Sequence, residues 1–129
     1  MARHYHVDIA RFASKTDAKW VDNLLSRFHV PGVDGARQGL SRRISEEGIY
    51  HIALVWLLNR DLGISVASAV PLATRLLSAE DGRVDFGDAL ELRLDGARFR
   101  SALDAAIADG VESLAPARRG RPPRAPIDG

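Results

Sequence analysis

Side chains that can hydrogen-bond to base edges and phosphates gather in residues 15–43 of this 129-residue chain. An Asn amide can pair with adenine through two hydrogen bonds, Lys can reach the acceptor atoms of guanine, and cationic side chains hold phosphate oxygens. These side chains fall into two groups. They are Lys15, Thr16, Lys19, Asn23 and Arg27 in the first group, and Arg37, Gln38, Ser41, Arg42 and Arg43 in the second. Their chemistry predicts equilibrium binding of a polyanion.

The formal charge is unevenly distributed along the chain, although it sums to only +1. Residues 1–44 carry eight Arg and Lys against four Asp, residues 45–114 carry six Arg against twelve Asp and Glu, and residues 115–129 carry four Arg against one Asp. The net charges of these segments are +4, −6 and +3. A basic beginning and a basic end favour a polyanionic partner at both ends of the chain, or a solvated surface throughout.

Several other kinds of chemistry are excluded by the residue types and spacings. The chain has no cysteine, which removes disulfides, thiolate metal sites and cysteine nucleophiles. His4 and His6 form a pair without a convergent third ligand, and no nucleophile elbow, phosphate-binding loop or paired catalytic carboxylate motif occurs. The longest apolar run, Ile52 to Leu58, is far shorter than the roughly 20 residues of a membrane span. We therefore expect a cytoplasmic protein without enzymatic activity, metal or cofactor.

The first basic group is placed by two short helices that the apolar spacing predicts. Asp8 can cap a helix over residues 8–14, and Thr16-Asp17 can begin a second helix that runs to Phe28. On this second helix Trp20, Leu24 and Phe28 share an apolar face, while Asp17, Lys19, Asn23 and Arg27 lie on the opposite face. Two helices with almost no linker have the spacing of a helix-turn-helix. Residues 29–45, with three glycines and a proline, predict a loop or a small hairpin.

The second half of the chain predicts three more helices and a strand. Ser45 can cap an apolar helix that ends at Gly63, and Ser65 can begin another, in which Pro71 would remove one backbone bond and shift the start or kink the helix. Alternation over residues 89–94 predicts a strand. Asp95 can cap a last helix that extends to Leu114.

Four segments, in chain order, are similar to those of one known family. They are residues 8–13 (Asp-Ile-Ala-Arg-Phe-Ala), residues 16–28, residues 39–45 (Gly-Leu-Ser-Arg-Arg-Ile-Ser) and residues 46–65, which end in Leu-Gly-Ile-Ser. Over residues 5–78 the chain resembles the MerR-type winged helix-turn-helix regulators. The resemblance implies a mostly α fold with a small β component and a winged helix-turn-helix DNA-binding domain in residues 1–78. The strand and the C-terminal helix predicted above make residues 79–114 a segment for packing or dimerisation.

The resemblance also implies a function. The chain would be a small bacterial transcriptional regulator or an antitoxin-like autorepressor that binds double-stranded DNA, with no small-molecule effector. The helix over residues 16–28 would enter a major groove, and the wing arginines would hold phosphates. The sequence departs from the family at Asp17, Trp20 and Asp22, where more Arg and Tyr are usual. Both carboxylates would repel DNA unless Lys15, Lys19 or Arg27 pairs with them.

Residues 115–129 consist mainly of Ala, Pro, Arg and Gly, a composition that cannot bury apolar surface and predicts disorder. Within them, Arg119-Gly120-Arg121-Pro122 resembles the core of an AT-hook. In such a segment the two arginines lie along a narrow minor groove, where glycine avoids a clash. Arg119 and Arg121 are therefore predicted DNA contacts, and the alternative is a nonspecific solubilising extension.

An apolar stripe on the last predicted helix has two interpretations. Its members are Phe99, Leu103, Ile107 and Val111. They either pack on the chain's own core or pair with a second copy in a homodimer, the arrangement by which small DNA-binding domains gain affinity. A rival function, from a different class, is a protein–protein adaptor that keeps the fold without binding DNA and works through the acidic middle and this helix.

Overall fold

The computed structural model describes residues 3–34 and 42–119 of the chain. In chain order its elements are β1 (His4–Tyr5), α1 (Val7–Ser14), α2 (Ala18–Arg27), β2 (Val33–Asp34), β3 (Arg43–Ser45), α3 (Glu46–Leu62), α4 (Val66–Ser78), β4 (Arg83–Phe86), β5 (Leu90–Arg93) and α5 (Gly96–Arg119). Helices dominate, and the strands form two small antiparallel sheets, which confirms the predicted mostly α class with a small β component. No helix in these ranges is long and apolar enough to cross a membrane.

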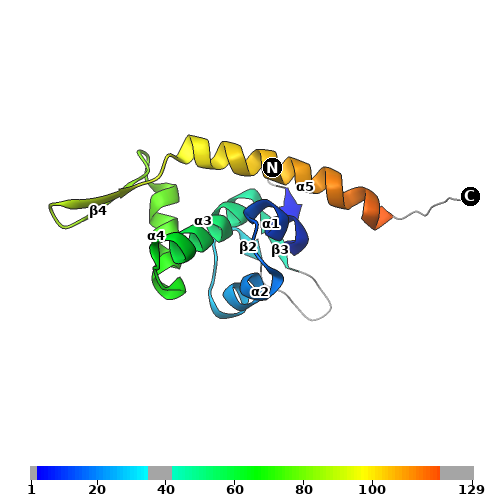
Figure 1. Ribbon diagram of the computed structural model, residues 1–129, viewed down its shortest axis with the longest axis horizontal. Helices are drawn as coiled ribbons and strands as arrows, with labels where there is room; N and C mark the ends of the chain where they lie inside the picture. Colours follow the sequence, from blue (N-terminus) through cyan, green and yellow to red (C-terminus); the bar gives the residue numbers. More distant parts are fainter. Residues whose placement is uncertain (1–2, 35–41, 120–129) are drawn as a thin grey trace, which may run out of the picture.

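Helix α3 is the centre of the core. Most of its side chains from Gly48 to Leu58 are buried, as expected for a helix that is apolar on nearly all sides. Helices α1, α4 and α5 pack against it. In Figure 1, α5 runs along one edge of the molecule, α2 lies at the opposite edge, and the β4–β5 hairpin extends beyond α4.

The predicted helix boundaries around α3 and α4 are confirmed by their caps. The Ser45 hydroxyl accepts a hydrogen bond from the Gly48 amide at 3.2 Å, and Gly63 ends α3 in the left-handed conformation. The Ser65 hydroxyl accepts from the Ser68 amide, so α4 begins directly after it. Pro71 lies inside α4 and does not delay its start.

Four elements differ from those that the sequence predicts. Helix α1 begins at Val7 and is capped by His6, whose ring nitrogen accepts from the Asp8 amide at 3.1 Å, so Asp8 lies in the first turn and is not the cap. Strands β1 and β4 were not expected, because runs of two and four residues carry little periodicity of their own. Each is stabilised by its partner: β1 pairs with β3, and β4 pairs with β5. Helix α5 continues to Arg119, five residues beyond Leu114, and the rest of the tail lies outside the described residues.

The apolar stripe of α5 packs inside the chain. Leu103 and Ile107 are 7% and 3% exposed, and Phe99 and Val111 are partly buried against the same core. At the start of α5, the Asp95 carboxylate accepts from the Arg98 amide at 3.1 Å, as predicted for the cap. Packing on the chain's own core, the first of the two interpretations, occupies Leu103 and Ile107, so these side chains are not free to meet a second copy.

Polar contacts fix α5 to the helices beneath it. The Tyr50 hydroxyl on α3 donates a hydrogen bond to the Asp104 carboxylate on α5. Burial, together with this carboxylate, raises the pKa of Tyr50 well above its ordinary value. The Arg100 guanidinium lies over the Tyr50 ring and donates to the Leu77 carbonyl at 2.9 Å. These contacts hold α5 in a fixed position on α3 and α4.

Candidate nucleic-acid interface

The turn between α1 and α2 is three residues long and held by local hydrogen bonds. Lys15 takes the left-handed conformation (φ 59°, ψ 38°) that ends α1. The Ser14 hydroxyl donates to the Ala10 carbonyl at 2.6 Å, so the Thr16 hydroxyl, 2.9 Å away, must donate to Ser14. The Asp17 carboxylate then accepts from the Trp20 amide and caps α2. These contacts fix the angle between the two helices, and they leave the Lys15 side chain exposed.

Helix α2 has one buried face and one exposed cationic face. Val21 and Leu24 are buried against the core. Lys19, Asn23 and Arg27, spaced four residues apart, are all exposed and lie on one side of the helix. Within the described residues neither Lys19 nor Arg27 has a carboxylate within ion-pair distance. The predicted exposed face of this helix is confirmed, and its two charges are free to meet an anion.

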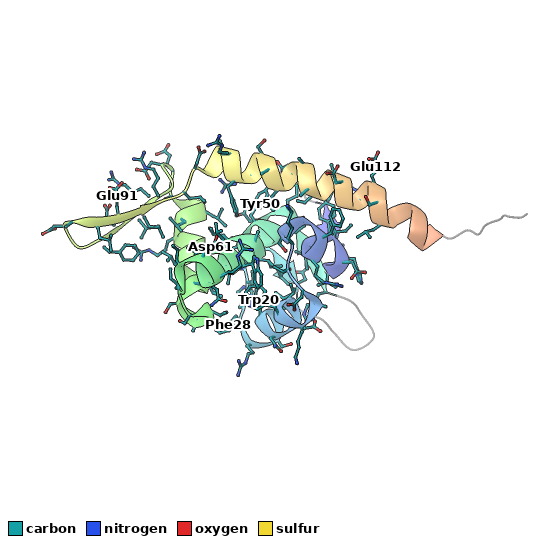
Figure 2. All side chains as sticks on the ribbon, in the orientation of Figure 1. Trp20, Phe28, Tyr50, Asp61, Glu91 and Glu112 are labelled. Atoms are coloured by element: carbon teal, nitrogen blue, oxygen red, sulfur yellow. The ribbon has the colours of Figure 1, made fainter. Side chains whose placement is uncertain are left out.

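Two tryptophans join α2 to the central helix. The ring of Trp20 on α2 packs edge-to-face on the ring of Trp56 on α3, with centroids 4.8 Å apart and an interplanar angle of 76°. Such pairs add about 0.5–1.5 kcal/mol beyond the burial of their area. Figure 2 shows Trp20 where α2 meets the helical body. Trp20 therefore anchors α2 on α3.

The strands after α2 form a small sheet that packs on the start of α3. Strand β3 is central, with β1 on one side and β2 on the other, both antiparallel. Gly32, just before β2, has φ +87°, and a Cβ built on it would lie 2.3 Å from the Gly48 amide nitrogen. The Ser45 amide donates to the Gly32 carbonyl at 2.9 Å. Only glycine permits this approach, which holds the chain before β2 against the start of α3.

Arg42 connects these strands to α2. Its guanidinium lies 3.3 Å from the Asp22 carboxylate and donates to the Ser26 hydroxyl, also at 3.3 Å. The Arg42 side chain is 23% exposed, whereas that of Asp22 is 66% exposed. The pairing that Asp22 needs is therefore supplied by Arg42, and not by Lys15, Lys19 or Arg27. In this arrangement Arg42 neutralises a carboxylate on α2 and is not presented as a free phosphate clamp.

The two neighbouring arginines of the predicted wing have different surroundings. Arg42, the residue before β3, contacts Asp22 and Ser26 of α2, whereas Arg43, the first residue of β3, is exposed. In the strand register Arg43 stands opposite Asp34 of β2. The other predicted wing contacts, Arg37, Gln38 and Ser41, lie outside the described residues, as does Arg121. Arg119 is the last described residue of α5, at the end of the fold that faces away from the β4–β5 hairpin (Figure 1).

The arrangement brings three of the predicted residues together and identifies others that the sequence did not single out. Lys19, Asn23 and Arg27 share the exposed face of α2. The Asp22–Arg42 pair and Ser26 were missed as a unit because they lie up to 20 residues apart in the chain. The only local signal was the four-residue spacing of Asp22 and Ser26 on one helix.

Three comparisons with known proteins give no match for this chain. No protein-family model matches the sequence, and no curated protein and no solved structure matches the chain significantly. The resemblance to MerR-type regulators therefore stays a prediction based on the motifs.

Proposed function

We propose that this chain is a winged helix-turn-helix protein that binds duplex DNA through α2, as a small transcriptional regulator. The observation that carries the proposal is the exposed face of α2, where Lys19, Asn23 and Arg27 line up at four-residue spacing. A tight three-residue turn joins α2 to α1, and the pair of tryptophans supports it from behind. An exposed, rigidly held helix with an amide between two cations fits the requirements of major-groove recognition.

The proposed mechanism is equilibrium binding that separates positioning from base reading. Asn23, in the middle of the exposed face, offers an amide for the edge of an adenine. Lys19 and Arg27 flank it and hold phosphates or guanine acceptors, and Lys15 in the turn adds a cation near the end of the helix. Asp22 lies on the adjoining side of α2, and Arg42 offsets its charge.

The charge of the surrounding surface supports this orientation. Helix α2 belongs to the basic segment of the chain (residues 1–44, net +4), whereas most of α3 to α5 belongs to the acidic segment (residues 45–114, net −6). In Figure 1, α5 lies along the opposite edge of the molecule from α2. A DNA duplex would therefore be attracted to the α2 edge and repelled from the α5 edge.

A salt-dependent DNA titration tests the proposal. The full chain is titrated into a fluorescent mixed-sequence duplex at several salt concentrations, as wild type, Arg27→Ala and Arg98→Ala. Each phosphate contact contributes about 0.9 to the slope of log K against log salt. We expect Arg27→Ala to flatten the slope by about this amount. Arg98→Ala, which removes an equally exposed charge from α5, should leave the slope unchanged.

Two outcomes would refute the proposal. One is an absence of binding at low salt by the wild-type chain, which would favour the protein–protein adaptor. The other is an equal loss of slope in both variants, because that would show attraction to the whole basic chain without a specific role for α2.

A further inference from the structure

The β4–β5 hairpin is a two-stranded sheet that extends away from the helical body (Figure 1). Its strands pair in the register Arg83↔Arg93, Val84↔Leu92, Asp85↔Glu91 and Phe86↔Leu90. A hairpin of two strands is marginally stable in water unless further strands or a packing surface complete it. Only Val84 of the hairpin strands is buried in the core. Because the sheet consists of β4 and β5 alone, no other strand of the described residues pairs with the outer edge of β5.

The apolar side of the hairpin is largely uncovered. Phe86 and Leu90 are 40% and 65% exposed, and Leu62, at the end of α3, is 56% exposed. These three are the large exposed hydrophobics of the described chain apart from Phe12, and all three line one groove of about 450 Å³ between α4 and the hairpin. Such a concentration of exposed apolar surface marks a contact site.

The hydrogen-bond register shows which backbone groups of β5 are free. The Leu94 amide donates to the Gly82 carbonyl at 2.7 Å, which makes Gly82 and Leu94 a hydrogen-bonded pair. Such pairs alternate along an antiparallel ladder, so the amide and carbonyl of Leu92 and of Leu90 also point toward β4. Those of Glu91 and Arg93 consequently point outward, away from β4. The outer edge of β5 offers hydrogen bonds at these two residues.

The charges of the two hairpin strands are not all paired within one chain. The register sets like charges opposite each other, Arg83 against Arg93 and Asp85 against Glu91, which is an unfavourable arrangement. The Arg83 guanidinium is shared by Asp81, Asp85 and Glu91 at 3.9, 3.4 and 3.8 Å. Arg93 has no carboxylate within ion-pair distance among the described residues.

We propose that β5 pairs with β5 of a second copy of this chain, antiparallel and about a two-fold axis at Leu92. In this register Glu91 of each copy stands opposite Arg93 of the other, so the two residues with outward backbone groups are the two that exchange hydrogen bonds. The same pairing places a carboxylate, Glu91 of the other copy, beside Arg93. The two-fold axis produces this ion pair twice. The segment from Leu90 to Leu94 (Leu-Glu-Leu-Arg-Leu) is thus complementary to itself in charge, hydrogen bonding and side-chain alternation.

The apolar side chains fit the same register. Leu92 meets its own copy in a non-hydrogen-bonded pair, where side chains approach most closely. Leu90, the most exposed large hydrophobic residue of the described chain, comes opposite Leu94 of the second copy. The result is a four-stranded sheet with one continuous apolar face. In this sheet the second copy covers the edge of β5 that a lone hairpin leaves exposed. This dimer does not depend on the proposed DNA binding.

The test uses charge reversal in the full chain, read by analytical ultracentrifugation. Glu91→Arg and Arg93→Glu each turn two attractive cross-strand pairs into repulsive ones, and each should raise the dimer dissociation constant by about tenfold or more. The double variant Glu91→Arg/Arg93→Glu restores opposite charges and should dimerise like the wild type. An equimolar mixture of the two single variants should form a heterodimer. Glu112→Arg, at the far end of α5, is the matched control and should not change the dimer (Figure 2).

The mixture distinguishes a single variant that is folded but cannot pair with itself from one whose hairpin has unfolded. A variant with an unfolded hairpin cannot form the heterodimer. A wild type that stays monomeric at the highest concentration reached would overturn the proposal and leave the groove to another occupant. Single variants that dimerise as well as the wild type would also overturn it. So would single variants that stay monomeric when mixed, since the self-complementary register requires their recovery.

Discussion

Replacing Asp22 and Arg42, singly and together, shows whether Arg42 holds DNA itself or neutralises a carboxylate that would repel it. The side chains are 3.3 Å apart, and that of Asp22 is 66% exposed. An ion pair this exposed contributes about 0.5 kcal/mol to folding. Asp22→Asn and Arg42→Ala should therefore both remain folded, with small changes in urea unfolding.

The effect on DNA binding should be larger than the effect on folding. Without Arg42, the Asp22 carboxylate would lie roughly 7 Å from a phosphate on the exposed side of α2, and the two charges would repel by about 0.6 kcal/mol in water. Two neighbouring phosphates make this about 1.2 kcal/mol, or about eightfold in the dissociation constant. We expect Arg42→Ala to weaken binding by about this factor, Asp22→Asn to strengthen it by about the same factor, and the double variant to bind about as the wild type does, because the two charges act additively on the phosphates.

The assay is a fluorescence anisotropy titration of a duplex at low salt, where screening is weakest. It compares the wild type, the two single variants and the double variant as a double-mutant cycle. A double variant that binds much more weakly than the wild type would refute the reasoning, because it would make Arg42 a direct phosphate contact.

Three further substitutions test the packing that positions α2 and α5. Gly48→Ala places a Cβ 2.7 Å from the Gly32 carbonyl oxygen, so it should lower the free energy of unfolding by about 1–3 kcal/mol in urea titrations. Ile107→Ala, at a 3% exposed site, should lower it by about 2–5 kcal/mol, and no loss would show that α5 does not pack on the body. Tyr50→Phe removes the hydrogen bond to Asp104 and should lower it by about 1 kcal/mol at neutral pH. Because the folded state raises the pKa of Tyr50, the wild type should lose stability as the pH rises above about 10, and Tyr50→Phe should lack that part of the loss.

Local signals predicted most of the helices. Ser45, Ser65 and Asp95 cap the helices that they were expected to cap, because a side-chain oxygen acts on amides only two or three residues away. The exposed face of α2 likewise follows from the helical period. The sequence was therefore sufficient to place Lys19 and Asn23 beside each other on that face.

Contacts between distant residues could not be predicted in this way. Lys15, Lys19 and Arg27 are all nearer to Asp22 in the sequence than its partner Arg42, which is 20 positions away, so the pairing depends on tertiary structure. Arg43 lies in β3, a strand of only three residues that is defined by its pairing with β1 and β2. The self-complementary edge of β5 required the hairpin register, which no single strand contains.

Selection of bound fragments from a random duplex pool, run in parallel with the wild type and Asn23→Ala, tests most directly whether α2 reads DNA. If it does, the wild type enriches a defined motif, and Asn23→Ala keeps the motif except for relaxed preference at one adenine position. An unchanged motif with Asn23→Ala, or no enrichment by the wild type, would contradict the assignment of α2 as the recognition helix.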